Sequence, residues 1–202
     1  MNPAVFRFFL LTVAVALLGA CAIRQPAVVT ENFSFKLPTP RAGPAGGRSI
    51  AVLPFAAAPT ATGQMLLYRA GELRYEHDFY NRFLAPPAQL LTGELRSWLA
   101  RSQAGPVREP GAPLSSDLIV QPRLTELHAD YRDVGRPRAV VAMTMGLIAR
   151  DPDGNREVFE RTYRREVPMR EVSPTAAVEA WSRGVAEIFT QFTRDLRRAP
   201  DA

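Results

Sequence analysis

Residues 139–148 read AVVAMTMGLI, a run in which both odd and even positions carry apolar side chains. A strand with two apolar sides is buried on both faces, so this run predicts a central strand of a sheet. Further strands are predicted before and after it, from Asp117 to Tyr131 and from Val158 to Val167. The turn-forming residues 151–155, DPDGN, separate the last two strands.

Two helices are predicted to cover this sheet. The first opens at Pro86-Pro87, since proline is well tolerated in a first turn, and it ends before Gly105. The second follows Ser173, a good N-cap, with Pro174 as its first residue. Both carry the three-and-four spacing of a helix packed on a core. The apolar positions are Leu91, Leu95, Trp98 and Leu99 in the first helix, and Val178, Trp181, Val185, Ile188, Phe192 and Leu196 in the second.

The N-terminal half of the domain predicts shorter strands. Alternating apolar residues indicate a strand from Phe33 to Leu37, and a buried strand is expected from Ser49 to Leu53. Residues 65–69 and 73–76 are typical of a β-hairpin with Gly71 in its turn. Together these elements predict an α+β fold: a mostly antiparallel sheet of about five to six strands, with two amphipathic helices packed on one face.

The chain begins with a segment typical of export. Arg7, a 13-residue apolar stretch from Phe8 to Ala20, and small residues at its end make a secretory signal peptide. Its last four residues, Leu18-Gly19-Ala20-Cys21, resemble a bacterial lipobox. The resemblance implies acylation of the Cys21 thiol, cleavage before Cys21 and acylation of the new N-terminus.

Two other interpretations fit this segment less well. An uncleaved transmembrane anchor needs roughly 20 apolar residues, more than the stretch offers. An ordinary signal peptide would leave Cys21 as an incidental thiol. Lipidation therefore gives the expected organisation: residues 1–20 as signal peptide, 21–31 as lipidated cysteine and tether, and 32–198 as the folded domain. Ala22 favours the outer membrane, facing the periplasm, because Asp at this position retains lipoproteins at the inner membrane of enteric bacteria.

Composition and motifs argue against several function classes. Cys21 is the only cysteine, so its acylation would leave no thiol for a disulfide. The net charge of +5 is modest, and no basic run with interleaved aromatics indicates nucleic-acid binding. Neither a phosphate-binding Gly-rich loop nor a Gly-x-Ser-x-Gly elbow is present. We expect no enzymatic activity, no catalytic residue and no cofactor.

Metal binding is not expected either. His77 and His128 lie on separate segments without a cysteine nearby, so we interpret them as surface or sheet-edge residues. Residues 151–155 resemble the start of a calcium loop, but Gly154 is fourth rather than sixth and Thr162 stands where glutamate is required. A hairpin turn is the better interpretation.

Four aromatic residues close to one another form the remaining candidate site: Tyr75, Phe79, Tyr80 and Phe83. They have two interpretations, a surface that contacts a partner or lipid, and core packing at the entrance of the first helix. An exposed apolar patch would favour the first interpretation, because such patches mark interaction sites.

The chain as a whole resembles the ABC-type transport auxiliary lipoproteins, the family that includes the paraquat-inducible protein C type. The resemblance covers roughly residues 33–197. Its matching pieces are Phe33–Leu37, Leu67–Arg69, residues 75–83, Pro86-Pro87, Leu124–Leu127 and Ala180-Trp181. Many members carry Trp where this chain has Phe83, and the family offers no catalytic residue to carry over.

The resemblance implies a periplasm-facing outer-membrane lipoprotein without enzymatic activity. Its implied partners are an inner-membrane ABC permease, an ATPase, a protein with a mammalian-cell-entry domain, and the membrane itself through the acyl chains. Together these would move lipids, phospholipids in the first place, between the two membranes, and the family also allows a ring of identical copies. The alternative is a structural or assembly lipoprotein of the cell envelope without lipid cargo.

Overall fold

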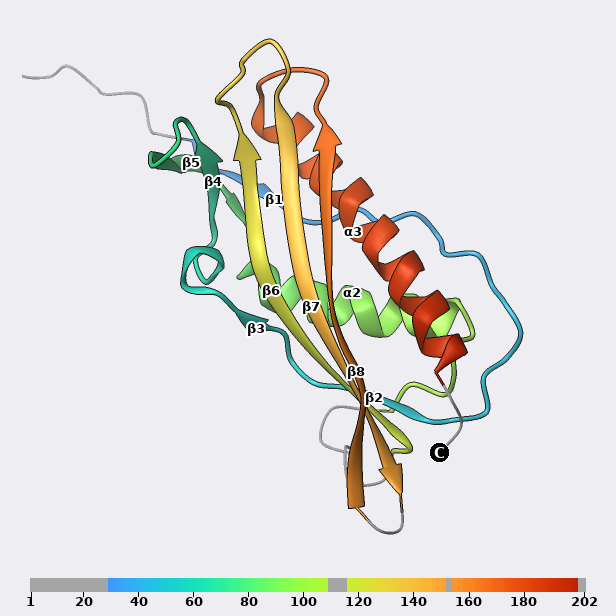
Figure 1. Cartoon of the computed structure of the whole chain (residues 1–202). Coiled ribbons are helices and arrows are strands. Elements are labelled where there is room, and N and C mark those ends of the chain that lie inside the picture. The colour runs from blue at the N-terminus through green and yellow to red at the C-terminus, as the bar shows by residue number, and fades with distance from the viewer. Residues whose placement is uncertain (1–28, 109–115, 152–153, 200–202) are drawn as a thin grey trace, which may run out of the picture.

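The computed structural model describes residues 29–108, 116–151 and 154–199, which form a mixed sheet with two helices on one face (Figure 1). Across the sheet the strands follow the order β1-β5-β4-β6-β7-β8, and β2 and β3 also pair with β6. The strands are β1 (Glu31–Phe33), β2 (Ile50–Val52), β3 (Ala56–Ala57), β4 (Met65–Arg69), β5 (Tyr75–Phe83), β6 (Leu118–Asp130), β7 (Arg138–Asp151) and β8 (Gly154–Pro168). The helices are α2 (Pro87–Arg101), α3 (Pro174–Arg198) and the short 3-10 helix η1 (Pro59–Ala61).

Three long antiparallel strands form the centre of the sheet. β6 pairs with β7 from Leu118 opposite Ala149 to Asp130 opposite Arg138, and β7 pairs with β8 along its whole length. On β7, Val141, Met143, Met145 and Leu147 face the core, and their neighbours Val140 and Ala142 are buried as well. The predicted central strand is therefore confirmed.

The two helices cover the same face of the sheet (Figure 1). The Ser173 hydroxyl accepts a hydrogen bond from the backbone N–H of Ala176 at 3.2 Å, which confirms the predicted N-cap. α3 packs on β7 and β8, and the indole N–H of its Trp181 donates to the carbonyl oxygens of His128 (3.2 Å) and Val140 (3.1 Å). α2 packs against α3, with Trp98 edge-on to Phe189. The predicted α+β class is confirmed.

The described residues form an eight-stranded sheet, which adds short strands in parallel pairings to the predicted antiparallel ones. β2, β3 and β4 follow one another along one edge of β6, and all three run parallel to it. β1 likewise pairs in parallel with β5. A sequence pattern shows which residues are apolar, but not which distant strand they pair with. These parallel pairings could therefore not be predicted from the local sequence.

The strand predicted from Phe33 to Leu37 is wrong beyond its first residue. After Phe33 the chain leaves the sheet and crosses α3, where the backbone N–H of Lys36 donates to the Ser182 hydroxyl at 3.1 Å. Phe35 is buried and stacks on Phe83, with ring centroids 5.0 Å apart. The alternation that indicated a strand therefore reflects packing against the helix layer.

Two other predictions concern turns. The β4–β5 hairpin is confirmed, but its second strand continues to Phe83, so the aromatic residues from Tyr75 onward belong to a strand. Positions 152 and 153 of the turn predicted at residues 151–155 lie outside the described residues, and Asp151 pairs with Gly154 on either side of them. The signal peptide, Cys21 and most of the tether also lie outside the described residues.

Gly184 sets how closely α3 approaches the sheet. A Cβ atom there would lie 2.8 Å from Val141 Cγ1 and 3.2 Å from Val167 Cγ2, closer than side chains pack. We expect Gly184→Ala to lower the free energy of unfolding by about 1–3 kcal/mol through overpacking, as measured by urea denaturation.

Gly93 on the exposed side of α2 is the matched control, because a Cβ atom there meets nothing within 4 Å. Gly93→Ala should raise the free energy of unfolding by about 0.5–1 kcal/mol, since alanine is the better helix former. Equal stabilisation by both substitutions would contradict the close approach of α3.

Candidate functional site

One edge of β6 is interrupted, and the interruption opens the sheet. β3 pairs as far as Leu124 and β4 begins to pair at Ala129, so in the described chain no strand pairs with residues 125–128 on this edge. The β6–β7 register also shifts between Leu124 and Glu126. The segment with η1 connects β3 to β4 beside this break (Figure 1).

An apolar cavity of about 440 Å³ occupies this break, and we call it the gap cavity. Buried side chains form its floor: Phe83, Leu127 and Trp181, with Leu67 beside them. Exposed residues form its rim: Thr60, Thr62, Met65, Tyr75 and His77. Its volume lies within the range of about 300–1,000 Å³ typical of small-molecule sites, and its lining suits an apolar group.

The four predicted aromatic residues divide between core and surface. Phe83 is 1% exposed, stacks on Phe35 and lies 5.9 Å from the Trp181 ring, so it packs in the core, where it also lines the gap cavity. Tyr75 is half-exposed and lies on the rim of the gap cavity. Phe79 and Tyr80 are exposed and lie outside the cavity lining. The structure therefore does not gather the four side chains into one site.

Sequence patterns predicted the elements that carry several lining residues of the gap cavity, but not that these residues meet. Trp181 belongs to the apolar stripe of α3, and Leu127 and Met65 belong to strands that pattern alone identifies. Their meeting depends on where β4 separates from β6, which is a property of long-range pairing. Only the break in the apolar pattern of β6 after Leu124 hinted at an irregular strand.

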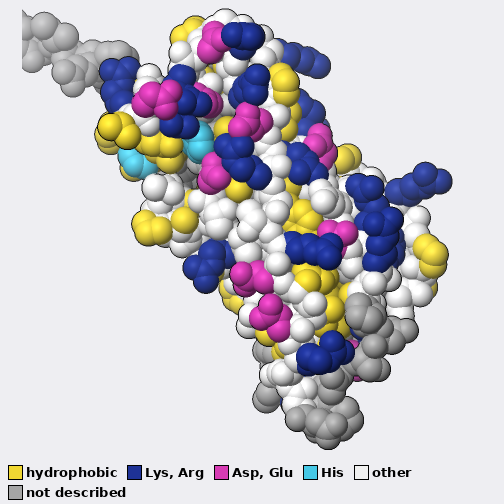
Figure 2. Space-filling model, viewed as in Figure 1, with side chains coloured by type: hydrophobic (Ala, Val, Ile, Leu, Met, Phe, Trp, Pro, Cys, Tyr) yellow, Lys and Arg dark blue, Asp and Glu magenta, His cyan; other side chains and the backbone are white. Residues whose placement is uncertain are grey.

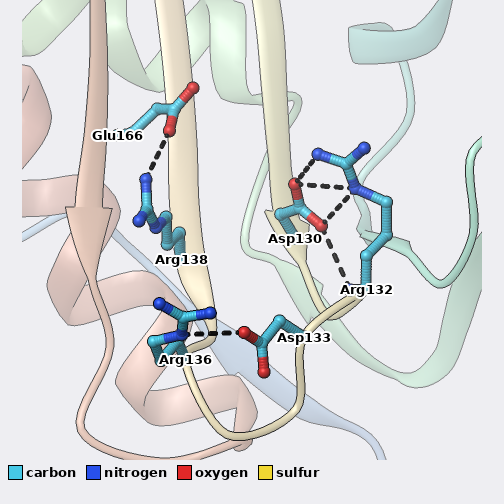
Figure 3. Close-up of a pocket in the computed structure, with 6 residues that line it drawn as sticks. All are labelled: Asp130, Arg132, Asp133, Arg136, Arg138 and Glu166. Atoms are coloured by element: carbon cyan, nitrogen blue, oxygen red, sulfur yellow. Dashed lines mark hydrogen bonds and ion pairs between the residues drawn. The ribbon is translucent and has the colours of Figure 1, made fainter.

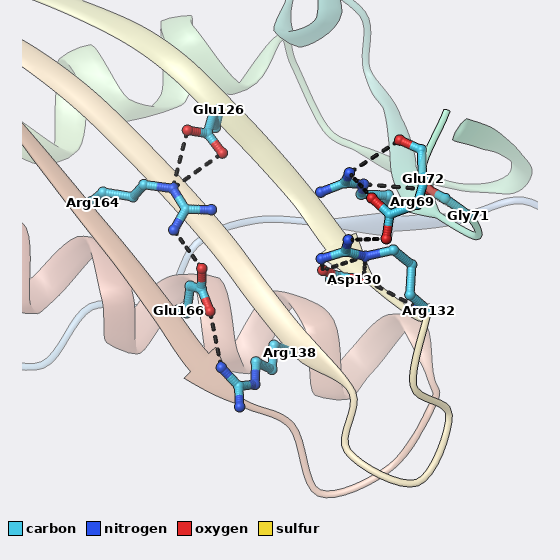
Figure 4. A network of polar contacts seen from close by, with 9 residues as sticks. All are labelled: Arg69, Gly71, Glu72, Glu126, Asp130, Arg132, Arg138, Arg164 and Glu166. Carbon is cyan, nitrogen blue, oxygen red and sulfur yellow. Dashed lines mark hydrogen bonds and ion pairs between the residues drawn. The ribbon is translucent and has the colours of Figure 1, made fainter. Parts of the chain in front are cut away.

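A network of ion pairs lies across β6, β7, β8 and the adjoining turns (Figure 4). Arg164 of β8 bonds Glu126 of β6 at 3.1 Å and also Glu166, which accepts from Arg138 at 3.0 Å. These side chains are substantially exposed, so each pair contributes little to stability.

A second group of ion pairs joins two turns. Arg132, after β6, pairs with Asp130 at 2.7 Å and with Glu72 of the β4–β5 turn at 2.6 Å. A depression of about 300 Å³ lies here, lined by three acidic and three basic residues (Figure 3). They form the pairs Asp130–Arg132, Asp133–Arg136 and Glu166–Arg138. Because the charges balance, the depression offers no net charge to a ligand.

Neither histidine takes part in a metal cluster among the described residues, where no group of three or more His, Cys, Asp and Glu side chains could hold a metal ion. His77 lies on the cavity rim. His128 is buried, with its ring 5.6 Å from that of Tyr75, and burial lowers its pKa. Of the two expected positions, surface or sheet edge, the surface is wrong for His128, whereas the residue does lie on the unpaired edge segment of β6. None of the described helices is long and apolar enough to span a bilayer.

Solved structures share this fold. Protein XCC0632 from Xanthomonas campestris, described as a DUF330 protein, has a TM-score of 0.71 at 16% identity, covering 84% of this chain and 96% of that one. A structure of an uncharacterized protein has a TM-score of 0.64 at 16% identity, covering 83% and 99%. Hypothetical protein CT253 from Chlamydia trachomatis gives 0.53 at 10% identity, covering 76% and 98%.

No protein-family model and no curated protein matches the sequence. At identities of 10–16% the three structures show a common fold. One fold hosts many functions, so function has to be argued from the residues of this chain.

The ion pair of Asp130 makes a prediction about pH. Hydrogen bonds from Arg132 lower the pKa of Asp130 from 3.8 to about 2. A carboxylate with a lowered pKa contributes stability above its unfolded-state pKa and loses it as pH falls through the folded value. We expect the stability difference between the wild type and Asp130→Asn to be full at neutral pH and to shrink between about pH 4 and pH 2.

Urea denaturation at a series of pH values measures this difference. Asp133→Asn is the comparison: Arg136 lowers the pKa of Asp133 too, but this exposed pair lies within one turn, whereas Arg132 also joins its turn to Glu72. The pH-dependent difference for Asp133→Asn should therefore be the smaller of the two. A difference for Asp130→Asn that stays constant down to pH 2 would contradict the assigned ion pair.

Proposed function

We propose that the protein is a membrane-anchored, periplasm-facing lipoprotein of the bacterial outer membrane, without enzymatic activity. It would act as an auxiliary component of an ABC-type, mammalian-cell-entry-linked system that moves lipids between the inner and outer membranes. Two features of the sequence support this proposal: the lipobox-like Leu18-Gly19-Ala20-Cys21, and the family-like motifs that follow it in the same order within residues 33–197. The fold shared with three solved structures is compatible with it but does not specify it.

The position of the gap cavity relative to the N-terminal tether is the observation that carries the proposal. β1 is the first strand after the tether, and it pairs with β5 from Glu31 opposite Asn81 to Phe33 opposite Phe83. β5 also supplies Tyr75, His77 and Phe83 to the cavity lining. The chain coming from the anchor therefore leads directly onto the strand that forms a cavity wall.

The cavity suits an acyl chain better than a polar ligand. Its floor residues Phe83, Leu127 and Trp181 are buried and offer apolar and aromatic surface. Burying apolar surface is worth about 25 cal/mol per Å². The hydroxyls of Thr60 and Thr62 and the imidazole of His77 lie on the exposed rim, where a polar headgroup would stay in water. Such binding makes and breaks no covalent bond.

Substitution at the rim tests the cavity. Met65 is 37% exposed and lines the cavity, so Met65→Trp adds bulk at its mouth without disturbing the core. We expect this variant to bind less of a fluorescent phospholipid analogue than the wild type. Leu84→Trp is the matched control, because Leu84 is exposed but does not line the cavity. Equal binding by all three proteins would argue against acyl-chain binding in the gap cavity.

The proposed partners are tested by purifying the full chain in mild detergent. We expect mass spectrometry to find a diacylglycerol thioether at Cys21 and to identify an ABC permease, its ATPase and a mammalian-cell-entry protein together with phospholipid. Cys21→Ser should abolish fractionation with the outer membrane. Recovery of only cell-wall or barrel-assembly proteins would favour the structural alternative, and an unmodified Cys21 thiol would refute the anchor.

A further inference from the structure

Exposed hydrophobic side chains gather around the β4–β5 hairpin and the N-terminal end of the described chain. Val29, Leu73, Phe79 and Tyr80 are 78%, 98%, 76% and 56% exposed, and Tyr75 is half-exposed. We call these five residues the tether-side surface. Figure 2 shows hydrophobic side chains beside the two histidines, of which His77 belongs to β5. Grouped exposed apolar residues mark an interaction site more often than scattered ones do.

A bulge in β5 turns part of this surface outward. The Asp78 carboxylate accepts hydrogen bonds from the backbone N–H groups of Tyr80 (2.9 Å) and Asn81 (3.0 Å) and from the Tyr68 hydroxyl (2.7 Å). The β4–β5 register shifts over the same stretch. The exposure of Phe79 is therefore held by a hydrogen-bonded bend and is not the result of a loose loop.

The tether ends next to this bulge. β1 runs parallel to β5 with Glu31 opposite Asn81, so the chain before it, at Val29, leads along β5 toward Phe79. In Figure 1, β1, β4 and β5 lie together at one end of the sheet. The surface and the point where the tether joins the domain thus occupy the same corner of the molecule.

The length of the tether restricts which surface reaches the membrane. Eight residue steps separate Cys21 from Val29, and at about 3.5 Å each they span at most about 28 Å. A domain of this size has a radius of gyration of about 15 Å, so its diameter exceeds that length. If Cys21 carries the acyl chains, the tether-side corner is held near the bilayer and the opposite end of the sheet is held away from it.

The chemistry of the surface fits a bilayer interface. Tyrosine, as at position 80, is enriched at the boundary between headgroups and acyl chains, and Phe and Leu, as at positions 79 and 73, form the apolar face of segments that lie in this interface. Among the described residues nearby, the charged side chains form no net positive patch for anionic lipid: Arg69, Arg74, Arg82 and Arg132 against Glu31, Glu72, Glu76, Asp78 and Asp130. Contact with the membrane would therefore come from apolar insertion and not from charge attraction.

We propose that the tether-side surface inserts into the interface of the bilayer that holds the lipid anchor, and so fixes the orientation of the domain on the membrane. The inference rests on the lipid anchor of the proposed function. The partner is the lipid surface itself, zwitterionic or anionic. The opposite end of the sheet, including the far part of β8, points into the periplasm.

Site-specific labelling of the full, acylated chain tests this orientation. Because acylation consumes the only native thiol, Phe79→Cys provides a single site for the environment-sensitive fluorophore NBD. In phosphatidylethanolamine–phosphatidylglycerol vesicles we expect a blue shift of its emission and quenching by brominated acyl chains. Glu160→Cys on β8 is the control, since Glu160 is exposed and pairs opposite Gly146, near the β2 end of β6. Its label should keep water-like emission.

Further outcomes separate the inference from the proposed function. The signal at position 79 should persist at raised salt and in vesicles of phosphatidylethanolamine and phosphatidylcholine alone, and should weaken when Leu73 and Tyr80 are replaced by serine. Water-like emission at position 79, or release by salt, in an acylated chain that floats with the vesicles would overturn the inference and leave the anchor standing. An unmodified Cys21 would overturn both.

Discussion

The contact between Trp181 and the β6–β7 pair holds the two layers of this protein together. The indole is fully buried, donates to carbonyl oxygens on both strands, and packs beside Phe83 of β5. One side chain of α3 therefore fixes the helix to the long antiparallel strands and to the more peripheral β5. It also forms part of the floor of the gap cavity, so the cavity can exist only while this contact keeps α3 in place. A buried indole N–H without acceptors would cost about 1–3 kcal/mol, so the two carbonyl oxygens fix where the Trp181 side chain can lie.

The short parallel strands depend on contacts from outside the sheet. β2 and β3 have three and two residues, too few to hold by ladder hydrogen bonds alone. Helix α2 supplies the missing contacts: Arg96 donates to the Val52 carbonyl at 2.7 Å, and the Thr92 hydroxyl accepts from the Phe55 N–H at 2.9 Å. Because α2 holds β2 and the residue just before β3, these strands stay in place even though the edge of β6 is interrupted directly after β3.

Elements with a local signal could be predicted from the sequence, whereas features that depend on distant pairing could not. α2, α3 and β7 follow from periodicity, proline placement and the Ser173 cap, and each lies where its pattern indicates. The strand expected after Phe33 fails because alternating residues pack equally well on a helix layer. The sequence drew attention to the four aromatic residues but could not show where each lies. Phe83 is buried, Tyr75 lies on the cavity rim, and Phe79 and Tyr80 are exposed, a division that depends on the bulge at Asp78. The gap cavity depends on where β4 leaves β6.

The bulge at Asp78 also affects how readily the edge of this sheet can pair with another strand. β5 lies near the edge of the sheet, and β1 covers only its last three residues. An open, regular edge strand is a template for pairing with another chain, and bulges are one of the means by which proteins prevent it. Asp78 breaks the regular ladder through its bonds to Tyr80 and Asn81, and the same bend exposes Phe79. Blocking of strand pairing and presentation of an apolar side chain are thus two consequences of one hydrogen-bonded turn. A substitution such as Asp78→Ala would affect both together.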